Sequence, residues 1–295
     1  MRITQNTFTK NYLLNINNAR ARMSRLQDQL STGKKVLNAS DDPEAANRIL
    51  RIKNIIAKHE QFAANVSDGE TFSQATTSAL DRFSDMLVEA KDILSRARNG
   101  SRVPDLQTFA NQIDQLISDV VQTANTTFNG KYLFGGTQTT EAPFILAADR
   151  SAVTTNPNGI TGEIRIIVDE GRTQVVNIDG QQAFQGTAIF QTLIQIRNDM
   201  QNGLAPTAAQ LDAVTAHLDY VASQAGKSGL IMSALEMDGR YLDERSTELE
   251  SLLSLDQDTD FAEATMQLKK EELMLDAALS VGARIIPKTL MDFLR

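Results

Sequence analysis

Apolar residues near the start of the chain recur at alternating intervals of four and three positions. They are Tyr12, Ile16, Ala19, Met23, Leu26 and Leu30. A mean interval of 3.5 residues keeps side chains on one face of a helix and is typical of a coiled-coil seam. We therefore predict an amphipathic helix that ends at Gly33, because glycine readily adopts the left-handed conformation that follows many helices.

A second helix start lies in the sequence Ser40-Asp41-Asp42-Pro43. Pro43 disfavours helical geometry at the residue before it and suits the first helical position. Asp42 is therefore the expected N-cap, with its carboxylate accepting from free backbone N–H groups. The apolar seam that follows runs, with one slip, to Asn99-Gly100. A continuous helix of this length would measure about 85 Å.

The second half of the chain repeats this organisation in reverse. A third helix opens at Pro104, and after residue 185 a shorter helix leads to a second very long one that starts at Pro206 and runs to about residue 256. In the last helix Phe261, Leu268 and Leu275 stand seven positions apart, and Leu279 follows four later. These intervals predict a second terminal seam.

The segment 131–185 differs from its surroundings. It is rich in Gly, Thr, Asn and Pro and contains alternating stretches at 164–168 and 175–178, the second of which precedes Asp179-Gly180. Such patterns predict short strands joined by turns, and two neighbouring strands can form a hairpin. We expect a small β-rich insertion between the helical halves.

The expected fold class is therefore mainly α, with the bundle built from both chain ends. Residues 1–40 and 258–295 would form a terminal coiled-coil domain, 41–130 and 186–257 a long-helix bundle, and 131–185 the insertion. Residues 1–60 carry a net charge of +6 and residues 236–295 a net charge of −7. Opposite charges favour pairing between the two ends, although each could also be a solvated helix face.

Composition excludes several function classes. The formal net charge of the 295 residues is −8, whereas nucleic-acid binding needs a cationic surface. No apolar run approaches the ~20 residues that span a bilayer, and no apolar stretch of a cleavable secretory signal stands at the start. We therefore expect no nucleic-acid or membrane partner. Cysteine is absent and there are only two histidines, which argues against an enzyme or a metal-binding protein.

No residue pattern indicates catalysis, a cofactor or a metal. Asp256, Asp258 and Asp260 resemble the start of a calcium loop, but the required glycine and glutamate positions hold Phe261 and Gln267. A helix break with an N-cap explains these aspartates better. Gly135-Gly136 is too short for a phosphate-binding loop. We expect a protein that is not an enzyme, while an enzyme or metal-binding helical protein with an undetected site stays open.

Several motifs together resemble the flagellin superfamily. At the N-terminus, residues 29–35 (Gln-Leu-Ser-Thr-Gly-Lys-Lys) precede Ser40, Asp41, Asp42 and Pro43. A block at 125–136 includes Tyr132, Phe134, Gly135 and Gly136, and leads to Ala142-Pro143-Phe144. Near the C-terminus, residues 258–264 match the Asp-x-Asp-aromatic-Ala-Glu pattern. One departure is Gly226-Lys227-Ser228, where the family usually has Gly-Ala-Arg.

Within this superfamily, the block at 125–144 and the modest size of the insertion resemble the branch of proteins that joins the hook to the filament. The alternative is a minor flagellin, a subunit of the filament itself. The resemblance implies an elongated flagellin-like helical bundle whose terminal helices form an inner coiled-coil layer. It further implies a structural protein of the bacterial flagellum that assembles as a homo-oligomeric ring between a hook-side junction protein and flagellin. The implied location is extracellular, at the hook–filament junction, after type III export with a chaperone bound at the C-terminal helix.

We expect the assembly interface to use the two terminal seams. Its candidate residues are Ile16, Met23, Leu26, Leu30, Phe261, Leu268, Leu275 and Leu279. An amphipathic helix without neighbours exposes its apolar stripe, so the ends would be disordered or marginal in the monomer and would order on assembly.

Overall fold

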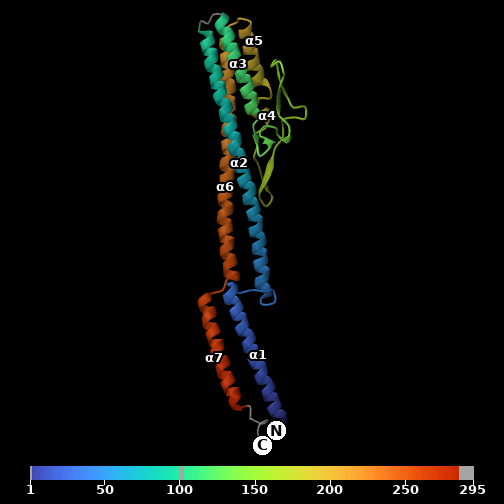
Figure 1. The fold of residues 1–295 in the computed structure, drawn as a ribbon, viewed down its shortest axis with the longest axis vertical. Coiled ribbons are helices and arrows are strands. Elements are labelled where there is room, and N and C mark those ends of the chain that lie inside the picture. Colours follow the sequence, from blue (N-terminus) through green and yellow to red (C-terminus); the bar gives the residue numbers. More distant parts are fainter. Residues whose placement is uncertain (1, 100–102, 286–295) are drawn as a thin grey trace. The chain divides into compact units, whose positions relative to one another are not determined.

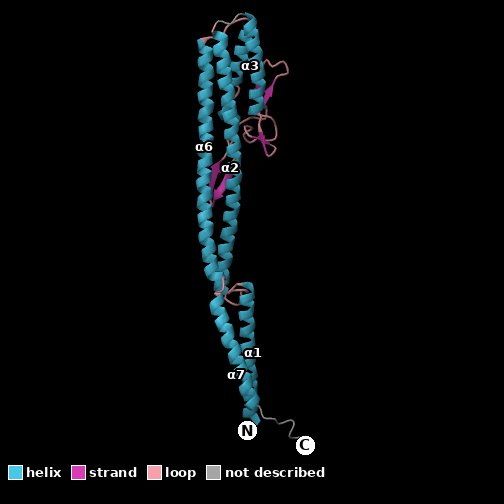
Figure 2. Ribbon diagram, turned by 60° about the vertical axis from the view of Figure 1, so that its left-hand side comes forward, coloured by secondary structure: helices cyan, strands magenta, loops and turns pink. Residues whose placement is uncertain are grey.

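The computed structural model describes residues 2–99 and 103–285 and consists mainly of long helices (Figures 1 and 2). The helices are α1 (Arg2–Thr32), α2 (Pro43–Arg98), α3 (Val103–Ala124), α4 (Gly180–Phe184), α5 (Ala188–Gln201), α6 (Ala208–Gln257) and α7 (Phe261–Ile285). The predicted mainly α fold class is confirmed. Among the described residues, no helix combines the length and the apolar character needed to cross a membrane.

The chain folds as two compact units. The terminal unit comprises residues 1–58 and 245–295, and the central unit comprises residues 59–244. The long helices α2 and α6 contribute to both units. As the pattern of seams predicts, each unit combines residues from the two halves of the chain.

The helix boundaries follow the predicted local signals. Gly33 has φ +70°, and its N–H donates to the carbonyl of Gln29 at 2.9 Å, which ends α1. The Asp42 carboxylate accepts from the N–H groups of Glu44 and Ala45 at 3.1 and 2.9 Å. These bonds satisfy donors that have no partner inside the helix, so the prediction of Asp42 as N-cap is confirmed.

A cluster of five phenylalanines forms the centre of the central unit. Each side chain is at most 1% exposed. The rings of Phe83 and Phe184 lie 4.4 Å apart between centroids, and those of Phe134 and Phe184 lie 4.8 Å apart. Phe144 and Phe190 complete the cluster at 5.0 Å. Because Phe134, Phe144 and Phe184 belong to the segment between α3 and α5, that segment is an integral part of the core.

Within residues 2–99 and 103–285, the strands form three separate two-stranded antiparallel hairpins. The pairs are β1 (Thr127–Phe128) with β2 (Lys131–Tyr132), β3 (Phe144–Leu146) with β4 (Val153–Thr155), and β5 (Arg165–Asp169) with β6 (Arg172–Val175). The last hairpin lies on α2 and α6, where Val168 and Val176 pack with Val66, Leu235 and Leu242.

The prediction of a strand over 175–178 is wrong. The strand ends at Val175, since the side chain of Asn177 accepts from the N–H of Ile164 at 2.7 Å and donates to the carbonyl of Gly162 at 2.8 Å. These side-chain hydrogen bonds take the place of the backbone hydrogen bonds that would continue the β-ladder. Asp179-Gly180 is a helix start and not a hairpin turn, because the Asp179 carboxylate accepts from the N–H of Gln182 at 2.8 Å.

Candidate assembly interface

Helices α1 and α7 lie side by side in the terminal unit (Figures 1 and 2). On α1, Ile16 is 7% exposed, and Tyr12, Ala19, Met23, Leu26 and Leu30 are partly buried. On α7, Ala264 and Gly282 are buried and Leu268 and Leu275 are partly buried. The α1 seam and the part of the predicted α7 seam formed by Leu268 and Leu275 therefore face each other within one chain.

Polar contacts fix the alignment of these two helices. The hydroxyl of Tyr12 donates to the carbonyl of Ala278 at 2.8 Å. A Cβ at Gly282 would lie 1.9 Å from that hydroxyl oxygen, so only glycine leaves room for it. The guanidinium of Arg22 donates two hydrogen bonds of 3.0 Å to the carboxylate of Glu271. This bidentate pairing lowers the pKa of Glu271.

A second bidentate pair joins α2 to the end of α6. Arg48 donates to both carboxylate oxygens of Asp256 at 3.0 Å and lowers the pKa of Asp256. Both ion pairs connect the basic N-terminal segment with the acidic C-terminal one. The predicted attraction between the chain ends is thus present as two specific contacts. Their exposure keeps their contribution to stability small.

The loops that precede α2 and α7 are tied together by a short antiparallel bridge. Lys34 pairs with Asp258, the N–H of Lys35 donates to the carbonyl of Gln257 at 2.7 Å, and that of Thr259 donates to the carbonyl of Gly33 at 2.9 Å. Beside the bridge, Asp258 accepts from Ser254. This bridge aligns the loop that follows α1 with the loop that precedes α7.

The acidic triplet at 256–260 has separate structural roles. Asp256 pairs with Arg48, and Asp260 caps α7 by accepting from the N–H groups of Ala262 and Glu263 at 2.8 and 3.1 Å. The arrangement is that of a helix break with an N-cap. No group of three or more metal-ligating side chains occurs within residues 2–99 and 103–285.

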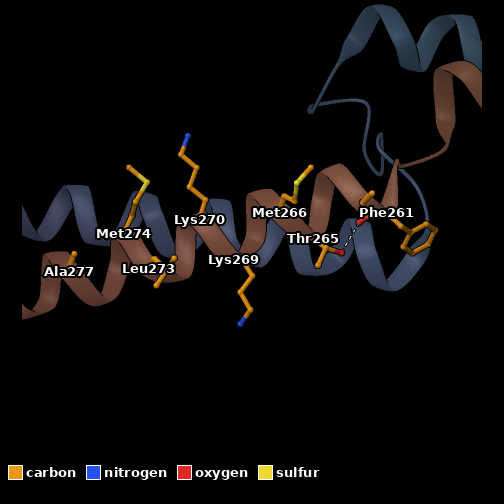
Figure 3. A pocket seen from close by; sticks show the side chains of 9 residues that line it. Phe261, Thr265, Met266, Lys269, Lys270, Leu273, Met274 and Ala277 are labelled. Atoms are coloured by element: carbon orange, nitrogen blue, oxygen red, sulfur yellow. Dashed lines mark hydrogen bonds between the residues drawn. The ribbon is translucent and has the colours of Figure 1, made fainter.

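One surface of α7 is apolar and open. Phe261, Met266, Leu273 and Met274 are 54–69% exposed, and Lys269 and Lys270 stand among them (Figure 3). Leu279 and Val281, 41% and 51% exposed, also lie on this helix. A contiguous apolar patch rimmed by charged residues is typical of a protein-binding surface. We call the surface of Phe261, Met266, Leu273 and Met274 the open face of α7.

The predicted interface residues divide between these two surfaces. Ile16, Met23, Leu26 and Leu30 lie on the inner face of α1, and Leu268 and Leu275 on the inner face of α7. Phe261 and Leu279 remain exposed. The sequence argument did not single out Met266, Leu273 and Met274, although 266 and 273 also stand seven apart. A search for a second line of apolar residues on the same helix would have found them.

The motif residues of the β-rich segment pack in the core or form a hairpin and a tight turn. Phe134 is fully buried and Tyr132 pairs with Thr127 in the first hairpin. A Cβ at Gly135 would lie 2.4 Å from the carbonyl oxygen of Gln138, and one at Gly136 would lie 2.4 Å from the backbone of Thr161. These glycines permit a tight turn beneath the phenylalanine cluster.

The N-terminal motif organises the loop between α1 and α2. Asp41 accepts from the N–H of Asn38 at 3.0 Å, next to the cap made by Asp42. Ser40 and Pro43 are exposed at the same bend. All four residues lie at the turn that leads the chain from α1 into α2.

Known proteins share both the sequence pattern and the fold. Residues 3–139 match the family of the bacterial flagellin N-terminal helical region. Flagellar hook-associated protein 3 of Salmonella typhimurium is 31% identical over 192 residues, or 62% of this chain and 57% of the relative. The Escherichia coli protein of the same name is 27% identical over 186 residues, with the same two coverages. The match thus spans little more than half the length of these relatives.

Two solved structures show the same fold. A flagellar hook-associated protein from Vibrio parahaemolyticus superposes with a TM-score of 0.65 at 19% identity, covering 74% of this chain and 99% of its own. FlgL of Bacillus cereus gives a TM-score of 0.59 at 23% identity, covering 69% and 99%. The resemblance to the flagellin superfamily is confirmed: residues 3–139 match the N-terminal helical region of bacterial flagellins, and 62% of the chain is similar to flagellar hook-associated protein 3.

Proposed function

We propose that this chain is a structural, non-catalytic subunit of the bacterial flagellum that assembles as a ring at the junction between hook and filament. Two relatives that cover 62% of the chain are named flagellar hook-associated protein 3. Flagellins of Salmonella match in sequence over 39% of the chain. The alternative function, a minor flagellin, draws support from that shorter match.

The observation that carries the proposal is the open face of α7. Its Phe261, Met266, Leu273 and Met274 are each more than half exposed in the single chain. Burying one such side chain completely contributes about 1.5–3 kcal/mol. Several of them would give a neighbouring subunit a strong apolar contact, whereas the seam residues on the inner faces of α1 and α7 are already buried in part.

Head-to-tail contacts of this kind join different surfaces of successive copies and close into a ring when the rotation allows. The neighbours would be further copies of this chain, a hook-side junction protein and flagellin. Before export through the flagellar type III system, a chaperone would cover the same apolar helix α7. The mature protein would then lie outside the cell, in the flagellum.

The same proposal assigns the assembly role to the terminal coiled coil, residues 1–40 and 258–295, and a supporting role to the remaining helices and the β-rich segment. A single pair of helices has few neighbours to bury it. We therefore expect the terminal helices to be marginal in the dilute monomer and to order on assembly. Amide protection in these helices as strong as that in the central unit, measured by hydrogen exchange of the monomer, would contradict that part.

Point substitutions on the two faces of α7 test the interface. In a strain that lacks the wild-type gene, Leu273→Asp, on the open face, should leave the monomer folded but fail to restore filaments. Leu268→Asp should fail as well, and should also separate α1 from α7. Leu230→Asp is the matched control, because Leu230 is 72% exposed and lies in the central unit. Electron microscopy and swimming assays report the outcome.

A motile strain that carries only the Leu273→Asp protein would refute the interface. The deletion strain itself separates the two candidate functions. Hooks without filaments, with flagellin lost to the medium, support the junction protein, whereas persisting filaments support a minor flagellin.

A further inference from the structure

The core of the central unit is interrupted where α2 and α6 pass each other. On α6 the larger apolar cluster ends at Ala225, and the smaller one begins with Leu235. On α2 the corresponding limits are Ala79 and Val66. Only partly buried residues, Phe72 and Ile231, pack against both clusters.

Polar side chains, most of them small, are buried where α2 and α6 pass from the larger cluster to the smaller one. We call them the polar layer: Ser73, Thr76, Thr77, Gln224 and Ser228. Ser73, Thr76, Gln224 and Ser228 are at most 2% exposed. Since such side chains remove less apolar surface from water than Leu or Ile, this layer holds the helices together less firmly than the clusters on either side.

Hydroxyl groups of the polar layer also donate hydrogen bonds to backbone carbonyls of α2. The hydroxyls of Thr77 and Ser228 lie 2.9 Å apart, and both lie within reach of the Ser73 carbonyl oxygen, at 3.0 and 3.2 Å. Thr76 donates to the Phe72 carbonyl at 2.9 Å. Side chains that bond to a carbonyl four residues earlier compete with the helical ladder and favour bending.

Two glycines weaken α6 at the same level. Gly226 and Gly229 flank Ser228, and an added Cβ at either position would meet nothing within 4 Å. Packing therefore does not require glycine there. This contrasts with Gly69, where a Cβ would lie 2.8 Å from the side chain of Ile166. Glycine inside a helix raises the helix-opening equilibrium by about fivefold relative to alanine.

We propose that the polar layer and the glycine pair at 226 and 229 form a flexure, at which the two apolar clusters of the central unit tilt relative to each other while each stays packed. Three features coincide at one level: a break in the apolar core, carbonyl-directed hydroxyls on α2, and glycines on α6 that no contact demands. A subunit with this flexure adjusts its curvature without opening either cluster.

Hydrogen exchange of the purified full chain tests the local opening. In the wild type, amides of residues 222–232 should exchange faster than those of 211–221 and 233–243. The double substitution Gly226→Ala/Gly229→Ala should slow exchange in 222–232 by about 25-fold, the product of two fivefold effects. The matched control is Gly239→Ala in the same helix, where an added Cβ makes only ordinary contacts at 3.6 Å. It should leave 222–232 unchanged.

Distance measurements test the bending itself. The chain has no cysteine, so Asp212→Cys and Glu244→Cys place two spin labels on exposed sites of α6 that are ~48 Å apart along a straight helix. The distance distribution should be broad and should narrow in the double-alanine background. Equal exchange rates along α6, or a distribution that the alanines leave unchanged, would overturn the proposal. Both readouts use the monomer, so they do not depend on whether the chain forms a junction ring.

Discussion

Glycines, caps and aromatic rings set the geometry at the scale of single residues. Gly136 adopts φ +59° in a place where its Cα faces the backbone of Thr161. Directly before this turn lies Phe134, whose ring is fully buried against Phe184. The Tyr-Leu-Phe-Gly-Gly motif thus combines a core anchor with a turn that only glycine can make.

Substitution of Gly136 by alanine should destabilise the central unit. A left-handed conformation costs a residue with a side chain roughly 1–2 kcal/mol, and the added Cβ would also lie 2.4 Å from the Thr161 carbonyl group. We expect a total loss above 2 kcal/mol, measured by urea unfolding. Gly130→Ala is the control, because Gly130 has φ +76° but open space around it. If both variants lose the same stability, the close approach to Thr161 has no energetic role.

At the scale of elements, seam periodicity and chain-end charge bring α1 and α7 together. The seam of α1 predicted its inner face correctly, because one helix face suffices to bury residues at 3.5-residue intervals. α7 carries two apolar lines, and the sequence alone does not say which line meets α1. Contacts such as that between Tyr12 and Gly282 decide it.

Gly282→Ala should therefore loosen the terminal unit and leave the central unit intact. Its Cβ would lie 1.9 Å from the Tyr12 hydroxyl oxygen, which forces Tyr12 away from the Ala278 carbonyl. Hydrogen exchange in α1 should accelerate, because α1 loses a packed partner. The double variant Tyr12→Phe/Gly282→Ala removes the hydroxyl and should recover part of the protection. Unchanged exchange in α1 would show that this contact does not hold the pair.

At the scale of the whole molecule, the two units respond to acid in different pH ranges. In the central unit, burial lowers the pKa of His217 below 6.5, and its Nε2 lies 3.0 Å from the hydroxyl of Thr192. The unfolded histidine takes up a proton near 6.5, whereas the folded one stays neutral to a lower pH. In the terminal unit, Asp256 and Glu271 have lowered pKa values, so their contributions persist until the pH falls below about 4.

The free energy of unfolding of the central unit should therefore fall between about pH 6.5 and the lower pKa of folded His217, since the unfolded state binds more protons there. Thermal unfolding followed from about pH 7.5 to about pH 5.5, one unit either side of the ordinary histidine pKa, measures the drop. His217→Gln should flatten it, while His59→Gln serves as the control. A slope that His217→Gln leaves intact would assign the acid sensitivity to another group.

The sequence by itself determined the long helices, their boundaries and the pairing of chain ends, whereas the short helix α4 was missed. Local signals such as Asp42-Pro43 and Gly33 act within one turn of helix, so no distant residue is needed to predict them. The motifs likewise indicated the flagellin superfamily. The second strand of the last hairpin was misplaced, because its end depends on the bonds of Asn177 to residues 162 and 164, which the periodicity does not contain.

Only the tertiary structure decided which apolar surfaces are used up inside the chain and which stay open. Periodicity gives a side chain its face on a helix but not the partner of that face. The sequence pattern placed Leu268 with Phe261 in one seam, yet Leu268 is partly buried whereas Phe261 and Leu273 are 58% and 69% exposed. The same holds for the polar layer around Ser73 and Ser228, 155 positions apart, because its residues meet only when α2 and α6 fold together.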